Sequence, residues 1–489
     1  MVWWTLAVLV VLVSGIAFFS ARPVPLPEIK NAALPCVSYA PFRRTGHTPF
    51  DPELRLPPEA IEADLRLLAT VTSCIRTYGL DHGLDAVPRI ARKLGLRVLL
   101  GVWIGRDPVA NRRQLEKALT LTHTHRDVID LLIVGNEVLL RGELEPAALG
   151  ELLAGARRAS AVPVSYADVW AFWERHAEAL RPHVDVVSVH ILPYWEDDPV
   201  GIEAAVDHVY RTSEDMKRRF AGQPVFVAET GWPAAGRQRG PAVPGRLEQA
   251  RFVRELLARH AAEPLDFNVI EGFDQPWKRR LEGEMGGAWG LFDARGEQRV
   301  PLAGPVRPEP LFGALRWLSV PNLPPGSPGW FEWGGGLGLF GVALLCAVAA
   351  ARRLSVLGRS NPPATDRLLA TTLTLLLGLL AIDALWLIVD GRYHPLRWEL
   401  AAMPLPFLLG LAWLGERLPT PRGGQRLLAA VTAGTALGVV GIEGLANTQA
   451  LLYGGVLASM ALASLFLYRA HRAVTPSNRA GRSCNPPNG

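Results

Sequence analysis

Pro-Val-Phe-Val-Ala-Glu-Thr-Gly-Trp-Pro, the segment at residues 224–233, places Glu229 directly after a short apolar run. A second segment, Leu-Leu-Ile-Val-Gly-Asn-Glu-Val at residues 131–138, places Glu137 in the same way. Apolar runs of this length are typical of buried parallel strands. Carboxylates at the C-terminal ends of such strands would face the mouth of an α/β barrel, where these folds carry their chemistry. The pair predicts glycoside hydrolysis, which needs one carboxyl group as proton donor and another as base or nucleophile.

Strand-like and helix-like segments alternate from residue 34 to residue 312, and eight such units predict an α/β fold, a (β/α)8 TIM barrel. The strand candidates are Cys36–Tyr39, Cys74–Tyr78, Val98–Trp103, Leu131–Gly135, Val162–Ser165, Val184–Val189, Val225–Ala228 and Phe267–Glu271. Amphipathic helices are expected at Pro58–Leu68, Asn111–Thr122, Pro146–Ala159 and Gly245–His260. A doubly wound sheet would give fewer units and a glycine-rich first turn, which does not follow Tyr39.

The chain is 49% hydrophobic and its apolar residues are concentrated outside the barrel region, which predicts membrane segments. We expect an N-terminal anchor at residues 1–21, favoured over a cleaved signal peptide, and a linker at residues 313–333. An all-α multi-span membrane domain of five helices should occupy residues 334–468, followed by a cytoplasmic tail at residues 469–489. Arginines alternate between its loops, which predicts a multi-pass protein of the cell inner membrane with a periplasmic barrel.

The net charge of +5 lies largely between the apolar runs, so we interpret it as a topology signal and expect no nucleic-acid partner. The four cysteines fit no zinc motif, and the histidines show no metal-ligand spacing, so no metal or cofactor is expected. Cys36 and Cys74 fall on adjacent predicted strands. A disulfide would require an oxidising compartment, and two buried free thiols are the favoured prediction.

Further motifs give the chain a resemblance to family 17 of the glycoside hydrolases, over about residues 34–305. The shared motifs are Asn136-Glu137, Glu229-Thr230-Gly231-Trp232-Pro233, Phe273-Asp274-Gln275-Pro276-Trp277-Lys278 and Trp289-Gly290-Leu291-Phe292. Bacterial members are matched by Val37-Ser38-Tyr39-Ala40-Pro41-Phe42, Arg76-Thr77-Tyr78 and His190-Ile191-Leu192-Pro193-Tyr194-Trp195. The resemblance implies a (β/α)8 barrel, a retaining mechanism and β-1,3-glucan as substrate.

By this resemblance, Glu137 would be the general acid/base and Glu229 the nucleophile. Asn136 would bond the sugar 2-hydroxyl, while Tyr194 and Arg76 would hold Glu229 charged. The substrate-binding candidates are Tyr39, Arg76, Tyr78, Trp103, Asn136, His190, Tyr194, Trp195, Trp232, Trp277, Lys278 and Glu284. Plant members have a glutamate where this chain has Gln275 and a tyrosine where it has Leu192, so plant cleavage specificity is not carried over.

Three functions remain open from the sequence. The favoured one is a membrane-bound glucanosyltransferase that cuts and rejoins β-1,3-glucan, because a tethered enzyme suits polymer remodelling. A plain endo-β-1,3-glucanase is the second, and a non-catalytic glucan-binding or export component is the third. The expected partners are a β-1,3-glucan or oligosaccharide, membrane lipid and a membrane glucan synthase.

Overall fold

A computed structural model of the 489-residue chain describes residues 23–28, 33–236, 238–306 and 437. Eight parallel strands form a closed barrel in chain order, so each strand pairs with the next and β8 pairs with β1. The strands are β1 (Val37–Ser38), β2 (Cys74–Arg76), β3 (Arg97–Val102), β4 (Ile129–Asn136), β5 (Val164–Val169), β6 (Val186–His190), β7 (Val225–Thr230) and β8 (Phe267–Val269). The predicted (β/α)8 barrel is therefore confirmed.

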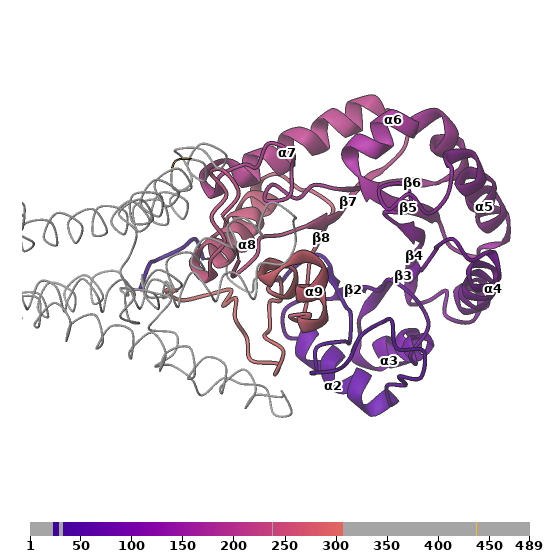
Figure 1. The fold of residues 1–489 in the computed structure, drawn as a ribbon, viewed down its shortest axis with the longest axis horizontal. Coiled ribbons are helices and arrows are strands. Elements are labelled where there is room, and N and C mark those ends of the chain that lie inside the picture. Colours follow the sequence, from indigo (N-terminus) through magenta and orange to yellow (C-terminus); the bar gives the residue numbers. More distant parts are fainter. Residues whose placement is uncertain (1–22, 29–32, 237, 307–436, 438–489) are drawn as a thin grey trace, which may run out of the picture. The chain divides into compact units, whose positions relative to one another are not determined.

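Helices form an outer ring around these strands (Figure 1). They are α2 (Pro58–Leu68), α3 (Val87–Leu94), α4 (Pro108–Thr124), α5 (Pro146–Ala159), α6 (Trp170–Leu180), α7 (Ile202–Arg219), α8 (Arg246–Ala262) and the short α9 (Arg279–Glu282). Four 3₁₀ turns complete the set: η1 (Leu84–Ala86), η2 (Arg181–His183), η3 (Pro276–Lys278) and η4 (Glu284–Gly287). Proline opens α2 and α5, where its missing N–H costs nothing, and both helices have the predicted bounds.

The fifth strand differs most from its prediction. The apolar pattern predicts Val162–Ser165, whereas β5 runs from Val164 to Val169. Pro163 has no N–H to donate to a ladder, although its carbonyl accepts a hydrogen bond from Leu132 N at 2.9 Å. The added residues include Tyr166 and Asp168, whose polar groups hid the strand from a pattern based on apolar runs.

Alternate residues of the strands pack into two separate clusters. Leu132 and Val134 of β4 belong to the large core that also contains residues of the surrounding helices. Leu131 and Ile133 belong to a small cluster made only of strand residues and their immediate neighbours. Because side chains alternate along a strand, the small cluster fills the barrel interior, as in other barrels of this size.

Cys36 and Cys74 form a disulfide inside this interior cluster, so the favoured prediction of two free thiols is wrong. The register explains the bond. Val37 of β1 lies opposite Ile75 of β2, so the preceding residues, Cys36 and Cys74, also lie opposite each other with 4.4 Å between their Cα atoms. The sequence placed both cysteines on neighbouring strands but did not give the register that aligns them.

The segments that lead into and out of the barrel are joined. Val24 and Val306 exchange two backbone hydrogen bonds of 2.7 and 3.0 Å. Arg254 of α8 is fully buried and donates to the carbonyls of Leu26, Pro27 and Gly304, so one guanidinium holds both segments.

The predicted anchor at residues 1–21 lies outside the described residues, and so do the linker at 313–333, the membrane helices at 334–468 and the tail at 469–489. Within the described part of the chain, no helix combines the length and hydropathy of a membrane span.

Candidate active site

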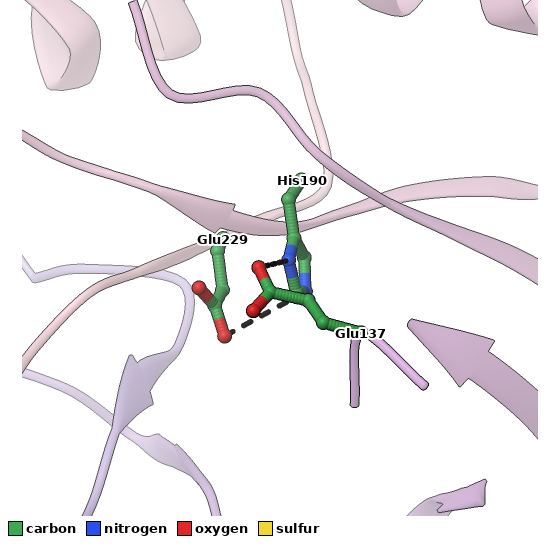
Figure 2. Close-up of side chains that lie close together, drawn as sticks. All are labelled: Glu137, His190 and Glu229. Carbon is green, nitrogen blue, oxygen red and sulfur yellow. Dashed lines mark hydrogen bonds and ion pairs between the residues drawn. The ribbon is translucent and has the colours of Figure 1, made fainter. Parts of the chain in front are cut away.

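The two predicted glutamates meet at the C-terminal end of the barrel, with His190 of β6 between them (Figure 2). Glu229 is the penultimate residue of β7, and Glu137 follows directly after β4. The backbone of Glu137 is left-handed, with φ of 52°, and its N–H donates to Ala167 O at 2.8 Å. Gly135 makes this turn accessible, because its φ is 89° and a Cβ there would lie 2.7 Å from Val138.

Two donors hold one oxygen of Glu229. Arg76 Nη1 donates to Glu229 Oε1 at 2.9 Å, and the Tyr78 hydroxyl donates to the same oxygen at 2.8 Å. The Arg76 guanidinium also donates to Asn136 Oδ1 at 2.6 Å and to Ala228 O at 2.7 Å, so it links the ends of β4 and β7. Sequence reasoning assigned Arg76 and Tyr194 to the support of Glu229; Arg76 donates to it, and the Tyr78 hydroxyl is a further donor.

Glu137 has a different environment. Its Oε1 lies 2.9 Å from His190 Nδ1, while His190 Nε2 lies 3.6 Å from Glu229 Oε1, so the imidazole is placed between the two carboxylates. Burial raises the pKa of Glu137, but the hydrogen bond and charge of His190, together with the charge of Arg141, outweigh burial and lower this pKa.

The turn after Glu137 rests on a buried carboxylate that sequence reasoning missed. Asp168 Oδ2 accepts from the backbone N–H groups of Leu139 and Leu140, at 3.3 and 3.4 Å, and from the Tyr166 hydroxyl. Burial raises the pKa of Asp168. Its position near the end of a strand was the available signal, but the strand itself was predicted too short.

Charged residues on the β8 side form a second cluster. Lys278 Nζ donates to both oxygens of Glu271, at 3.1 and 3.2 Å. Burial raises the pKa of Glu271 to about 7 despite the nearby Lys278. Burial also raises the pKa of Glu282, and the charges of Glu137 and Glu229 add to this rise. Glu282 therefore lies within electrostatic range of Glu137 and Glu229. The predicted Glu284 begins η4.

Several predicted aromatic platforms are at least partly open to solvent. Trp103 is 42% exposed, and the Arg141 guanidinium covers it at 4.0 Å from the ring centre. Trp195 is half-buried and has the Arg239 guanidinium 5.1 Å from its ring centre. Half-buried Trp277 packs edge-to-face against Phe50, which is 68% exposed and was not predicted. These rings remain candidates for stacking on sugar.

Gln275 is buried and hydrogen-bonded to Trp277. Its side chain is fully buried, accepts a hydrogen bond from Trp277 Nε1 at 2.9 Å, and donates to Ala40 O at 2.8 Å. A charged glutamate could not donate to that carbonyl, so an amide suits this position. The substitution relative to plant members therefore affects how the tryptophan is held.

Three predicted substrate-binding residues are almost fully buried. Tyr39 is fully buried and its hydroxyl donates to Asp64 Oδ2 at 3.2 Å. Trp232 is 1% exposed and stacks on Phe252, which leaves no ring face for a sugar. Tyr194 is fully buried, with its ring edge-to-face against Trp232. Position at a strand end therefore does not by itself give exposure.

The donor atoms of Glu137, His190 and Glu229 lie within 4.8 Å of one another, and their types are those of a metal site. The Arg76 guanidinium at 2.9 Å from Glu229 opposes a cation there, because like charges would share one carboxylate. Two carboxylates this close, one of them beside a hydrogen-bonding imidazole, suit acid–base and nucleophilic chemistry at a sugar carbon.

Comparison with known proteins identifies the domain. The profile of the BtgE/BtgC glycoside hydrolase domain matches residues 36–290, more than half of the chain. The probable β-glucosidase btgE of Aspergillus fumigatus is 27% identical over 225 residues, which cover 45% of this chain and 39% of that protein. Its Emericella nidulans counterpart is 29% identical over 216 residues, 43% of this chain and 38% of the relative. The chain thus spans about two-fifths of the length of these curated relatives.

Solved structures also align with the barrel. A β-1,3-glucanosyltransferase of Rhizomucor miehei, an active-site mutant in complex with laminaritriose, aligns with a TM-score of 0.48 and 22% identity over 55% of this chain and 98% of its own. An endo-laminarinase from Formosa Hel1_33_131 aligns with a TM-score of 0.45 and 18% identity over 55% of this chain and 84% of its own. By the match over residues 36–290, the chain belongs to the family of the BtgE/BtgC glycoside hydrolase domain.

Proposed function

We propose that this protein is a retaining β-1,3-glucan-active enzyme that cleaves glucan chains and transfers them through a glycosyl-enzyme on Glu229. One observation carries the retaining assignment: oxygens of Glu137 and Glu229 lie within 4.8 Å of each other. Retaining glycosidases keep their carboxyl groups about 5–5.5 Å apart, whereas inverting ones need about 6.5–9.5 Å to admit a water molecule.

In the first step, Glu229 attacks the anomeric carbon while Glu137 gives its proton to the departing glycosidic oxygen. The C1–O bond breaks, its electron pair stays on that oxygen, and a new bond joins C1 to the Glu229 carboxylate. Arg76 links Glu229 to Asn136, so the nucleophile and the proposed partner of the sugar 2-hydroxyl share one support. Bound sugar would displace water from Glu137, and this desolvation raises its pKa toward the protonated form that the step needs.

In the second step, Glu137 takes a proton from water or from a sugar hydroxyl, whose oxygen attacks C1 and releases the Glu229 carboxylate. Water gives hydrolysis and sugar gives transfer. Trp103, Trp195 and Trp277 follow β3, β6 and β8 along the chain and are partly exposed, so their rings are candidate acceptor platforms, which favours transfer.

The β-1,3 linkage rests on the sequence motifs shared with family 17. The curated relatives are named as probable β-glucosidases, which supports a β-glucoside as the substrate class. A hydrolase acting on the same glucan is the main alternative, because both outcomes use the same two glutamates. A purely glucan-binding role has no use for a nucleophile with two dedicated donors.

We test the mechanism with a 2-deoxy-2-fluoro-β-glucoside that carries a dinitrophenyl leaving group. The fluorine slows release, so the glycosyl-enzyme should accumulate and peptide mapping by mass spectrometry should find the added mass on Glu229. Proton NMR during cleavage of laminari-oligosaccharides should show the β-anomer first. An α-anomer as first product, or labelling of another residue, would exclude the proposal.

The location is also part of the proposal: a multi-pass inner-membrane protein with its barrel in the periplasm, close to a glucan synthase. The Cys36–Cys74 disulfide supports an oxidising compartment for the barrel, because such bonds are rare in the cytosol. Fusions of alkaline phosphatase after residue 306 should be active, and those of a cytoplasmic reporter at the same point should be inactive. The reverse pattern would contradict this location.

A further inference from the structure

We propose that Ser38 and Asn268 are positioning residues that fix the Tyr78 hydroxyl on one oxygen of Glu229 and so leave the other oxygen to form the glycosyl bond. Both are fully buried in the barrel, and neither was among the predicted site residues. Asn268 Nδ2 lies 2.7 Å from Ser38 Oγ, Ser38 Oγ lies 2.8 Å from the Tyr78 hydroxyl, and that hydroxyl lies 2.8 Å from Glu229 Oε1. The inference rests on the proposed function of Glu229 as nucleophile.

The two end groups, the Asn268 amide and the Glu229 carboxylate, determine the direction of every hydrogen bond in this series. The Glu229 carboxylate can only accept, so Tyr78 must donate to it and must accept from Ser38. The Asn268 amide nitrogen can only donate, so Ser38 accepts from Asn268 with one lone pair and gives its own hydrogen to Tyr78. The hydroxyls of Ser38 and Tyr78 therefore each have one defined orientation.

The orientation of the Asn268 amide has independent support. The same Nδ2 atom lies 2.8 Å from the carbonyl oxygen of Ala228, which can only accept. A flipped amide would place two acceptors against each other, so the nitrogen must point this way. Ala228 directly precedes Glu229 and also accepts from Arg76, so the chain is attached to the nucleophile's own strand at a second point.

This arrangement distinguishes the two oxygens of Glu229. Arg76 and Tyr78 both donate to Oε1, which is thereby held in place. We assign the new bond with C1 to Oε2. Formation of that bond removes negative charge from Oε1 and weakens both donations, and breakage of the C1–Oε2 bond restores the charge. These hydrogen bonds should therefore accelerate the second step, in which the Glu229 carboxylate is released, more than the first step, in which it attacks.

The experiment is a double-mutant cycle of Ser38→Ala and Tyr78→Phe in the full chain, measured on a dinitrophenyl β-glucoside and on laminari-oligosaccharides. With the activated glucoside the second step should limit kcat, so Ser38→Ala should lower kcat about tenfold, within the range of coupling between residues of one hydrogen-bond network. In the Tyr78→Phe background the same change should cost less than about twofold, because the hydroxyl through which Ser38 acts is gone. Asn268→Ala should lose the same Tyr78-dependent part of kcat and a further part that persists in Tyr78→Phe, because Asn268 also donates to Ala228 O.

Ser165→Ala is the matched control. Ser165 is equally buried on a barrel strand, and its hydroxyl contacts Ser188 Oγ at 2.6 Å and Val186 O at 2.7 Å, outside the chain that ends on Glu229. It should change thermal stability as Ser38→Ala does and leave kcat unchanged. Ser38→Thr, which keeps a hydroxyl, should recover most of the lost kcat.

The outcomes separate this inference from the proposed function. If the wild-type enzyme is active but Ser38→Ala lowers kcat by the same factor in the wild-type and Tyr78→Phe backgrounds, the positioning role alone is overturned. An unchanged kcat in Ser38→Ala would do the same. Failure of the wild-type chain to turn over either substrate or to be labelled at Glu229 would overturn the proposed function and this role with it.

Discussion

The ends of β7 and β4 each present a glutamate at the same end of the barrel, but they hold it in different ways. Glu229 is 5% exposed, lies within a strand, and has two donors on one oxygen. Glu137 is 24% exposed, lies on a left-handed turn, and has one imidazole as its partner. A nucleophile must return to the same position after each turnover, whereas an acid/base must exchange protons with its surroundings. Two carboxylates given different environments in this way can take different roles.

The largest expected effect is the loss of the better-held glutamate. Glu229→Ala should lower kcat by about 10⁴-fold or more on every substrate, because no glycosyl-enzyme can form. Added azide should restore turnover of an activated β-glucoside and give the α-glycosyl azide, since it attacks from the vacated side. Full turnover in the variant would remove Glu229 from the reaction. Glu263→Ala, which changes a glutamate at the C-terminal end of α8, is the control and should leave kcat unchanged.

Loss of Glu137 should have a smaller effect that depends on the leaving group. Glu137→Ala should lower kcat/KM about 10²–10⁴-fold on laminari-oligosaccharides, whose leaving oxygen needs a proton. A dinitrophenyl glucoside needs none, so its first step should be nearly unaffected, and azide should now give the β-glycosyl azide. Comparison of the two substrates by stopped-flow kinetics measures this difference. Equal losses on both substrates would contradict the acid/base assignment.

The contrast between these glutamates could be predicted only in part from the sequence. The apolar runs before Glu137 and Glu229 predicted the strand before each glutamate and placed both glutamates at the same end of the barrel. This was possible because the apolar pattern of a strand is a local property of the sequence. Which side chains surround each glutamate depends on contacts between distant strands. Arg76 lies 153 positions from Glu229, and the motif match rather than any local pattern brought the two together.

Exposure and register were the properties that the sequence did not supply. Tyr39 and Trp232 end or follow strands, as the open tryptophans do, yet both are buried. Tyr39 bonds Asp64 of α2 and Trp232 stacks on Phe252 of α8, contacts between distant segments that the sequence does not show. The Cys36–Cys74 bond depends on a pairing of β1 with β2 that a shift of one residue would destroy. Ser38 and Asn268 escaped notice because small polar residues within a strand give no signal until their partners are known.

His190 tests the environment of Glu137 through pH. The acid must be protonated, so its pKa sets the alkaline limit of activity, and the hydrogen bond and charge of His190 lower that pKa against the effect of burial. His190→Ala removes the imidazole contacts that lower the pKa of Glu137 and leaves burial and the charge of Arg141, so this pKa should rise and the alkaline limb of kcat/KM should move to higher pH. We also expect a fall in kcat of about tenfold, from looser placement of both carboxylates.

His123→Ala provides the control for this pH shift. His123 is an exposed residue of α4 that contacts the carbonyl of Ala159, and its loss should leave the pH profile in place. An alkaline limb that stays fixed in His190→Ala would show that His190 does not set the protonation of Glu137. A limb that moves to lower pH would reverse the sign of the interaction and contradict the geometry at Nδ1.

The smallest effect should come from the aromatic rim, where neither glutamate is touched. Trp277 is held by Gln275 and by Phe50 at its edge, so it presents a fixed ring near the barrel mouth. A sugar stacked on such a ring gains about 1 kcal/mol, equivalent to roughly fivefold in occupancy, and keeps water from the glycosyl-enzyme.

Trp277→Ala should therefore lower the ratio of transfer to hydrolysis about fivefold at millimolar laminari-oligosaccharide, while labelling of Glu229 by the fluoroglucoside keeps its rate. Phe50→Ala should act in the same direction by about twofold, because it removes only the support of the ring. Mass spectrometry of the products measures both ratios. If the wild-type enzyme forms only products as short as the donor or shorter, even with excess acceptor, Glu137 activates water alone and the protein is a hydrolase.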